Sequence, residues 1–408
     1  MYFTCSAVMP SKKDMAMIIN NGIFAGDIKG ETDIPGLRID FNAGLRMELP
    51  AGSWHVRVRD GVSGRIFFDS EVTDGRVQSL EQYYIPWEIE AWRDGELVFS
   101  HRLDFTEQKV YLYITGSVPE SLPPLGEAVQ MLSCARAFLA EHPCRLAVRP
   151  GAALADIARR CYPEFEIVEN MPEDAYATYH LGTFNEEPYF SPTSGRCMPW
   201  QDYARELLNL SRQPEIDEWR PGHPRPSELS EPYVCIAVQA SGGRKCWLYP
   251  GGWDEVVGYL RTLGYRVLCL DKEKSRYDDG QHIEMPEGAE DFTGSRPLAE
   301  RLEVLAYADM FIGVSSGLSW LAQAARCPVV LISGITMSYT EFFTPYRISN
   351  CFSCRGCFTD PRIVWGRDSI CPRHQGTDRE LECSRSITPG QVIEAIEQVR
   401  RDRADKGR

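Results

Sequence analysis

Three consecutive residues in the C-terminal half, Ser315, Ser316 and Gly317, have the types and the spacing of an anion-binding turn. They join the apolar run FIGV to the helical pattern SGLSWLAQAA without an intervening loop. A helix that begins there presents free backbone N–H groups and the positive end of its dipole, and two hydroxyls add further donors. Gly317 would let a ligand approach the backbone closely. The pattern indicates a phosphate or diphosphate site, and its alternative interpretation is a plain serine N-cap.

A second set of candidate ligands lies in the loop ASGGRKCW, which follows the apolar run YVCIAVQ. This loop carries Ser241, Arg244 and Lys245. A cation at the carboxyl end of a strand is well placed to meet the charge of a bound phosphate. A solvated surface loop would have the same composition.

A carboxylate, Glu127, follows Gly126 at the start of the long helical pattern LGEAVQMLSCARAFLAE. The helix dipole favours a negative charge in the first turn. Such a group can accept a proton from a hydroxyl nucleophile, so Glu127 is a candidate general base. A glutamate at a helix start with no chemical role is the alternative.

Five cysteines cluster near the C-terminus. Cys351, Cys354 and Cys357 form CxxCxxC, and Cys371 and Cys383 follow. A CxxC pair with two later cysteines predicts four thiolates around one tetrahedral ion. Thiolate ligands suit zinc and iron alike, and the spacing alone does not say which cysteine is spare.

The elements that must position these residues alternate between strands and helices over two long stretches, which is typical of parallel βαβ units. We therefore predict an α/β protein with two facing Rossmann-like domains, and ligands bound at the carboxyl ends of the strands. Alternating apolar residues with Asp-Gly turns predict a small antiparallel β domain ahead of them. The expected divisions are an irregular segment (1–36), the β domain (37–106), an acceptor-side Rossmann-like domain (107–225), a sugar-nucleotide-binding Rossmann-like domain (226–345), a Cys-rich metal finger (346–387), and a last helix with a disordered charged tail (388–408).

The composition excludes some classes of protein. The net charge of −14 argues against an extended nucleic-acid surface. No run approaches the roughly 18 apolar residues of a membrane helix, and no signal peptide is visible. We therefore expect a cytoplasmic protein with reduced cysteines and no membrane insertion.

Several blocks are more specific together than any single motif. They are EPYVCIAVQAS (231–241), GAEDFTG (288–294), FIGVSSGLSWLA (311–322), PVVLISG (328–334), EFFTPYR (341–347) and CPRHQGTDRELECSRSITP (371–389). With these blocks in this order, the chain from about Ile39 to Val399 resembles the bacterial autotransporter heptosyltransferases, a branch of the ADP-heptose-using glycosyltransferases.

The resemblance implies a GT-B type fold and transfer of heptose from ADP-glycero-manno-heptose to serines of an autotransporter adhesin. It also implies a large homo-oligomer, such as a dodecamer, and a donor site that needs no Mg²⁺. It places the diphosphate loop on Ser315, Ser316 and Gly317, and the phosphate-facing lysine on Lys245. The remaining donor-binding positions are Ser241, Asp291, Thr293 and Gly294. It implies ferric iron, with zinc as the alternative, on Cys354, Cys357, Cys371 and Cys383, which leaves Cys351 as the extra cysteine.

Two positions depart from the related patterns. The lipopolysaccharide heptosyltransferases carry a histidine where this chain has Trp320, which favours the protein-modifying branch. The family reads Leu-Gly-Asp where this chain has Leu-Gly-Glu, so the proposed base is longer by about 1.5 Å. A displacement of ~1 Å can cost ~100-fold in rate. The alternatives are therefore a catalytically weakened ADP-sugar-binding scaffold or a heptosyltransferase with another acceptor. A separate alternative, which depends on the metal, is a zinc-ribbon interaction protein on a Rossmann frame.

Overall fold

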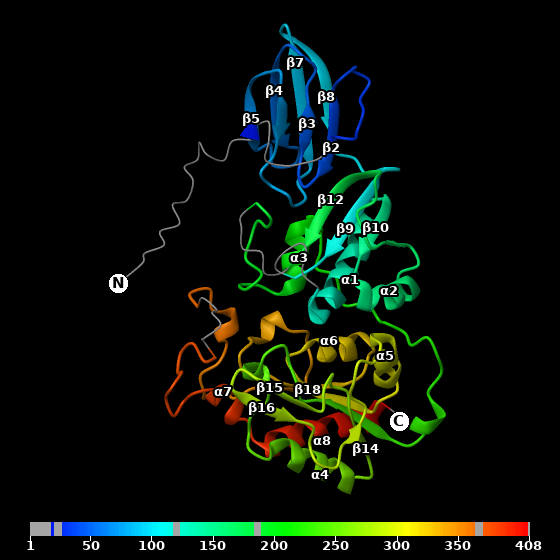
Figure 1. Ribbon diagram of the computed structural model, residues 1–408, viewed down its shortest axis with the longest axis vertical. Coiled ribbons are helices and arrows are strands. Elements are labelled where there is room, and N and C mark those ends of the chain that lie inside the picture. The colour runs from blue at the N-terminus through cyan, green and yellow to red at the C-terminus, as the bar shows by residue number, and fades with distance from the viewer. Residues whose placement is uncertain (1–17, 20–26, 117–122, 183–188, 364–369, 407–408) are drawn as a thin grey trace.

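Three tiers follow one another along the long axis of the molecule (Figure 1): an antiparallel sheet, a middle α/β lobe and a C-terminal α/β lobe. The structure, a computed structural model, describes residues 18–19, 27–116, 123–182, 189–363 and 370–406. Within these residues no helix has both the length and the apolar character needed to cross a membrane.

The outermost tier is a four-stranded antiparallel sheet in the order β5-β4-β7-β8. Its strands are β4 (Ser53–Asp60), β5 (Ile66–Thr73), β7 (Trp87–Arg93) and β8 (Glu96–Arg102). Alternate side chains of β4, those of Trp54, Val56 and Val58, are buried. The period-2 pattern in the sequence therefore predicted this antiparallel sheet correctly.

The middle lobe is built on an eight-stranded mixed sheet in the order β1-β6-β3-β2-β12-β9-β10-β11. Its strands are β1 (Ile18–Ile19), β2 (Arg38–Asn42), β3 (Arg46–Glu48), β6 (Arg76–Gln78), β9 (Lys109–Ile114), β10 (Arg145–Arg149), β11 (Glu166–Ile167) and β12 (Ala175–Leu181). β2 pairs parallel with β12, and the Asn42 side-chain amide donates to the Ala175 carbonyl (2.9 Å). The segment 37–106, expected as one domain, is thus divided between two sheets. Local periodicity cannot reveal this division, because the partner strand is more than 130 residues away.

Three helices belong to the middle lobe: α1 (Leu125–Glu141), α2 (Ala155–Cys161) and α3 (Trp200–Leu208). Every residue of α1 from Gly126 to Ala135 is buried, because the helix packs against β9, α3 and α6. The helical pattern LGEAVQMLSCARAFLAE predicted α1, whereas no pattern indicated β12 or α3. β12 has the sequence AYATYHL, and nearly all of its side chains are buried. Its tyrosines and histidine do not give the apolar pattern that would predict a buried strand.

The C-terminal lobe contains a six-stranded parallel sheet in the order β17-β14-β13-β18-β19-β20. Its strands are β13 (Tyr233–Ala237), β14 (Arg266–Cys269), β17 (Glu290–Asp291), β18 (Met310–Val314), β19 (Val329–Ile332) and β20 (Arg347–Ile348). A separate hairpin comprises β15 (Ser275–Asp278) and β16 (Gln281–Glu284).

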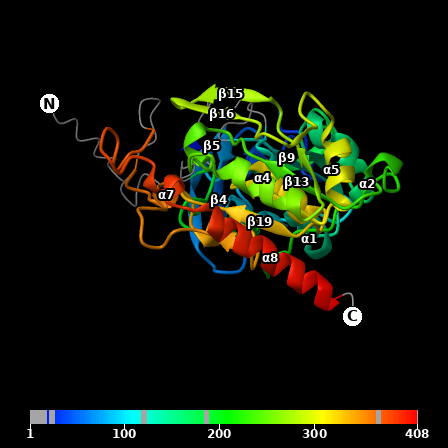
Figure 2. The same cartoon turned by 90° about the horizontal axis from the view of Figure 1, so that it is seen from below.

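Helices cover both faces of this parallel sheet. α5 (Leu298–Ala306) and α6 (Gly317–Ala324) lie on the face toward the middle lobe. α4 (Gly252–Thr262) and α8 (Pro389–Lys406) lie side by side on the other face (Figure 2). A short helix, α7 (Glu382–Arg385), ends the cysteine-rich segment. The α/β class predicted from the alternating pattern is therefore confirmed.

The C-terminal tail corrects one expectation. We expected disorder after about residue 402, but α8 continues to Lys406. The Arg403 guanidinium donates to the backbone carbonyl (2.8 Å) and the carboxylate (2.6 Å) of Asp309, and the Tyr346 hydroxyl donates to Asp402 (2.7 Å). These contacts hold the charged end of the helix on the sheet.

The connection between the two lobes is packed and ordered in the structure. Trp219 is buried, and its backbone N–H donates to the Ala324 carbonyl (2.8 Å) in the C-terminal lobe. Its indole N–H donates to the Tyr162 hydroxyl (2.9 Å) in the middle lobe. Trp219, which lies in the Pro-rich segment 214–232, therefore ties both lobes to the connection between them.

Candidate active site and metal centre

A cleft of about 520 Å³ opens between the lobes, at the carboxyl ends of β13, β18 and β19. The middle lobe contributes the start of α1, with Glu127, and Trp200 of α3. The C-terminal lobe contributes Lys245, the turn at Ser316 and Thr336. Parallel strands end at one edge of a sheet, so loops far apart in the sequence meet there.

The turn at the N-terminus of α6 forms one wall of the cleft. Ser316 is the N-cap residue (φ −140°, ψ 169°), yet its hydroxyl makes no capping hydrogen bond. The Ser316 hydroxyl oxygen is buried and has no partner among the described residues. A buried hydroxyl without a partner costs free energy unless a ligand satisfies it. Together with the helix dipole, this hydroxyl makes the turn a site for an anion.

Close helix packing brings the two lobes together at this wall. A Cβ on Gly317 would lie 2.6 Å from the Leu125 Cβ, and a Cβ on Gly126 would lie 2.6 Å from Cδ1 of Trp320. Each lobe thus supplies a glycine where the other supplies a side chain. The starts of α1 and α6 can therefore approach until Glu127 and Ser316 line the same cleft.

Lys245 provides the cationic wall. It ends the 3₁₀ turn Gly243–Lys245, its ammonium donates to the Ser241 hydroxyl (3.3 Å), and it lies 5.7 Å from the Phe358 ring centre. Burial lowers the pKa of Lys245, whereas the charges of Glu127 and Glu341 raise it, and the net pKa is below its usual value. The lysine is therefore a partly desolvated cation whose charge interacts with two carboxylates, which suits it to a multiply charged ligand.

The predicted base lies on the middle-lobe side of the cleft. Glu127 lies in the first turn of α1, is only 6% exposed, and lines the cleft. Its charge is the largest of those that raise the pKa of Lys245. A carboxylate and an ammonium thus face the same space, one able to accept a proton and the other able to hold an anion.

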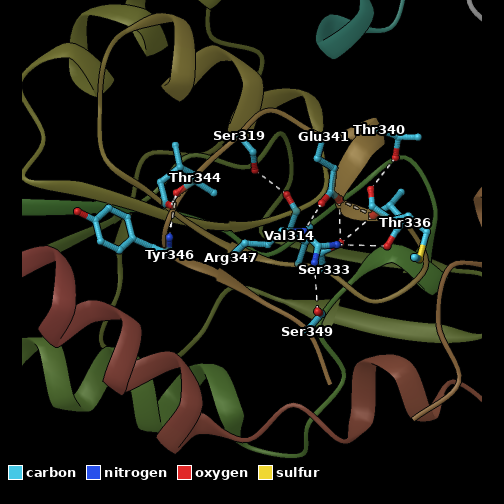
Figure 3. Close-up of polar contacts among 12 residues, drawn as sticks. Val314, Ser319, Ser333, Thr336, Thr340, Glu341, Thr344, Tyr346, Arg347 and Ser349 are labelled. Carbon is cyan, nitrogen blue, oxygen red and sulfur yellow. Dashed lines mark hydrogen bonds and ion pairs between the residues drawn. The ribbon is translucent and has the colours of Figure 1, made fainter. Parts of the chain in front are cut away.

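The loop after β19 forms the remaining wall and was not predicted as part of the site (Figure 3). Thr336 lines the cleft, and its hydroxyl bonds to the carboxylate of the buried Glu341. Arg347 pairs with that carboxylate through Nε (2.7 Å). The block EFFTPYR contained both charged residues, but a pattern could not show that they support a loop rather than contact solvent.

A second cavity of about 490 Å³ continues from the cleft past Ser316 and Gly317. It is lined by Ser241, Gly294 and Asp271 among others. The Asp271 carboxylate accepts hydrogen bonds from the backbone of Val238 (2.8 Å) and Gln239 (3.1 Å), which fixes the loop that leads to Ser241. The two cavities together give an elongated ligand site.

The cysteine-rich segment surrounds a separate small cavity lined by Cys354, Cys357, Cys371 and Cys383. Burial, followed by the neighbouring thiols, raises the pKa of Cys383 to about 12. Arg373 reaches Cys354 Sγ (3.6 Å). Thiolates suit a soft or borderline metal ion, and such an ion at this cavity would supply the charge needed to deprotonate them.

Two other residues lie beside these thiols. Ligand atoms of Cys354, His374 and Glu382 lie within 4.8 Å of one another. The Glu382 carboxylate already accepts bonds from Arg379 (2.6 Å) and from the Cys354 backbone (2.7 Å), and these bonds lower its pKa to about 2. Among the described residues, these three form the group whose possible ligand atoms lie this close together, whereas the four cysteines are joined only by the cavity that they line. Cys351 is exposed and accepts a hydrogen bond from Arg355 (2.8 Å).

Comparison of the sequence with known proteins identifies the family of the chain. A model of the N-terminal domain of glycosyltransferase TibC matches residues 35–95, and a model of glycosyltransferase family 9 (heptosyltransferase) matches residues 201–355. The autotransporter heptosyltransferase BAHTCr of Citrobacter rodentium (strain ICC168) is 38% identical over 374 residues, which cover 88% of each chain. The chain belongs to the autotransporter heptosyltransferases.

Two further members of this family bear on its site. The crystal structure of the dodecameric iron-containing heptosyltransferase TibC in complex with ADP-D-β-D-heptose superposes with a TM-score of 0.85 at 34% identity, covering 93% of this chain and all of TibC. The inactive autotransporter heptosyltransferase BimC of Burkholderia thailandensis is 34% identical over 396 residues, 93% of this chain and 91% of its own. The family is thus one of glycosyltransferases, and it includes a member without activity.

In this heptosyltransferase, two predicted donor residues lie away from the cleft wall. The Asp291 carboxylate pairs with Lys274 (2.6 Å) and accepts bonds from the backbone (3.0 Å) and hydroxyl (2.7 Å) of Thr293. These ion-pair and hydrogen bonds lower the pKa of Asp291. Asp291 lines another cavity, of about 290 Å³, beside Arg266. Asp291 and Thr293 instead shape the turn that leads to Gly294, and Gly294 does line the second cavity.

Proposed function

We propose that the chain is a protein O-glycosyltransferase that transfers heptose from ADP-glycero-manno-heptose to serine residues of an autotransporter adhesin. The observation that carries the proposal is the unpaired Ser316 hydroxyl at the N-terminus of α6, in a cleft of about 520 Å³. This volume is in the range of small-ligand sites, roughly 300–1,000 Å³. Family membership, and the ADP-D-β-D-heptose bound to TibC, support the choice of donor.

The donor lies across a GT-B arrangement of two Rossmann-like domains in this proposal. Ser315, Ser316 and Gly317 bind the diphosphate together with Lys245. Ser241 and Gly294 line the adjoining cavity, which would take the rest of the nucleotide. Asp291 and Thr293 act indirectly, by holding the turn that ends at Gly294.

The reaction is a single displacement. The acceptor serine oxygen forms a bond to the anomeric carbon while the bond from that carbon to the diphosphate oxygen breaks. Glu127 accepts the serine proton, and ADP leaves with the electron pair of the broken bond. The α6 N-terminus and Lys245 stabilise the charge that develops on ADP. They supply the positive charge that a divalent cation supplies in other transferases, so we propose no requirement for Mg²⁺.

The metal finger has a structural role in this account. Cys354, Cys357, Cys371 and Cys383 would hold one Fe³⁺, with zinc as the alternative, and the ion would fix the fold of a segment that has few buried apolar residues. The iron content and the dodecameric state of TibC support a homo-oligomeric iron protein. The described cysteines are all free thiols, which agrees with a cytoplasmic protein.

A second candidate function is favoured by one observation. Glu127 stands where the resemblance to the family implies an aspartate, and BimC is an inactive relative. A catalytically weakened scaffold would still bind the ADP-sugar. A heptosyltransferase with another acceptor is a third possibility.

The test is co-expression with an autotransporter adhesin passenger in cells that make ADP-heptose, followed by intact-mass measurement of the passenger. Heptose additions that disappear with Lys245→Ala support the proposed transfer. Donor binding by calorimetry without heptose additions would support the scaffold instead. Failure to bind either ADP or ADP-heptose would contradict both.

A further inference from the structure

Thr336 is a polar residue in the wall of the cleft whose hydroxyl is bonded to neighbouring side chains. It follows β19, is 5% exposed, and lines the cleft with Ser316 and Lys245. Figure 3 shows it within a compact group of polar side chains with Ser333, Glu341 and Arg347. Within this group the Thr336 hydroxyl proton has two possible acceptors, Glu341 and Ser333.

The hydroxyl protons of Thr336 and Ser333 both have acceptors within this group. The Thr336 hydroxyl donates to Glu341 Oε1, and Ser333 Oγ lies 2.8 Å from both Thr336 Oγ1 and Glu341 Oε1. The two hydroxyls carry one proton each, and three arrangements exist. Both hydroxyls can donate to Glu341, or Ser333 can donate to Thr336 while Thr336 donates to Glu341. In the third arrangement Thr336 donates to Ser333 while Ser333 donates to Glu341. In every arrangement the Thr336 proton stays inside the group.

Arg347 prevents the group from rearranging. Its Nε donates to Glu341 Oε2 (2.7 Å), Nη2 to Ser333 Oγ (2.9 Å) and the Thr336 carbonyl (3.3 Å), and Nη1 to Ser349 Oγ (3.1 Å). A guanidinium carries donors only, so it cannot accept the threonine proton. The Glu341 side chain is 3% exposed and therefore has almost no access to water as an alternative donor.

We propose that Thr336 is a specificity-determining residue that presents only hydrogen-bond acceptors to the cleft and thereby selects a hydroxyl of the donor sugar. The inference rests on the proposed function, because it names how the sugar of that donor is recognised. A sugar hydroxyl can donate to Thr336, whereas hydrogen or fluorine in its place cannot. Glu341 and Arg347 are positioning residues in this account, since they act through Thr336.

The test measures donor binding by calorimetry with ADP-heptose and with a set of deoxyfluoro ADP-heptoses, each with one sugar hydroxyl replaced by fluorine. One hydrogen bond of ordinary strength corresponds to roughly 3- to 10-fold in affinity. For the wild type we expect one analogue of the set to bind about 10-fold more weakly than ADP-heptose. Thr336→Val should bind ADP-heptose about 10-fold more weakly and should no longer distinguish that analogue. Thr336→Ser should restore the discrimination.

Thr344→Val is the matched control. Thr344 lies on the same segment and is not among the residues that line the cleft, and its hydroxyl donates to the Val329 carbonyl (2.7 Å) (Figure 3). This variant loses a buried hydroxyl but should discriminate among the analogues as the wild type does. Equal affinity of the wild type for all analogues, or unchanged discrimination in Thr336→Val, would overturn the inference. ADP and ADP-heptose would still bind in those cases, which separates this failure from a failure of the proposed function.

Discussion

Gly317 and Leu125 are in direct contact across the boundary between the lobes, and a Cβ at position 317 would lie 2.6 Å from the Leu125 Cβ. Neither residue can shift alone, because Leu125 begins α1 and Gly317 begins α6. The contact sets the width of the cleft at the place where the anion-binding turn faces the proposed base. It explains why a glycine is needed at the first position of α6.

Gly317→Ala should therefore separate the lobes. Overpacking of this kind costs ~1–3 kcal/mol of unfolding free energy, and a shift of ~1 Å at the site can cost ~100-fold in rate. We expect a lower melting temperature and transfer reduced by 10- to 100-fold. Gly258→Ala in α4 is the control, since a Cβ there meets nothing within 4 Å, and it should stabilise by up to about 1 kcal/mol. A Gly317→Ala enzyme with full activity would contradict the role of this contact.

Ser316→Ala should weaken donor binding without destabilising the fold. The hydroxyl has no partner among the described residues, so its removal costs the free protein nothing. A lost hydrogen bond to a charged diphosphate corresponds to about 10-fold in affinity. Calorimetry with ADP and thermal unfolding measure the two effects. Ser319→Ala is the counterpart: its buried hydroxyl donates to the Val314 carbonyl (2.6 Å), so this variant should lose about 1 kcal/mol of stability.

Glu127→Gln should reduce the turnover number by ~10²- to 10⁴-fold, because the amide cannot accept the serine proton. ADP affinity should stay the same or rise, since a negative charge near the diphosphate is removed. Single-turnover transfer to an adhesin fragment separates the two quantities.

Glu127→Asp distinguishes a working base from a weakened site. If the backbone is adjusted to glutamate, the shorter side chain misplaces the carboxylate by about 1.5 Å and lowers the rate by roughly 100-fold. We expect this decrease. A gain of activity in Glu127→Asp would support the weakened scaffold.

Cys383→Ser should lower both the metal content and the melting temperature, because it removes a thiol from the small cavity at the cysteine-rich segment. Elemental analysis and thermal unfolding measure both. Cys351→Ser should change neither, since Cys351 is exposed. Loss of metal in His374→Ala would favour a mixed Cys/His/Glu ligand set over four thiolates.

Acidification should destabilise the middle lobe through His180. Burial lowers the pKa of His180 to about 4, and its Nε2 bonds to the Thr115 hydroxyl (2.5 Å). The unfolded chain takes up a proton near pH 6.5 and the folded chain does not, so stability decreases as the pH falls from about 6.5 to 4. The full effect is about 3 kcal/mol. His180→Gln should flatten this part of the stability profile in urea titrations at several pH values.

The local sequence determined the type of many helices and strands, and which short segments carry the candidate site residues. The strand-turn-helix at Ser315–Gly317, the basic loop at Lys245 and the cysteine spacing were visible because each depends on residues within a few positions. The helix α1 was visible for the same reason, since its pattern lies within one continuous segment.

Tertiary structure decided which of these residues meet. The pairing of β2 with β12, the contact between Gly317 and Leu125, and the group around Thr336 all join residues from separate elements. Periodicity reports only which face of an element is apolar, not which partner covers it. The same reason placed Asp291 beside Lys274 rather than in the cleft: the direction of a side chain at a strand end depends on the neighbouring loop, which the motif itself does not encode.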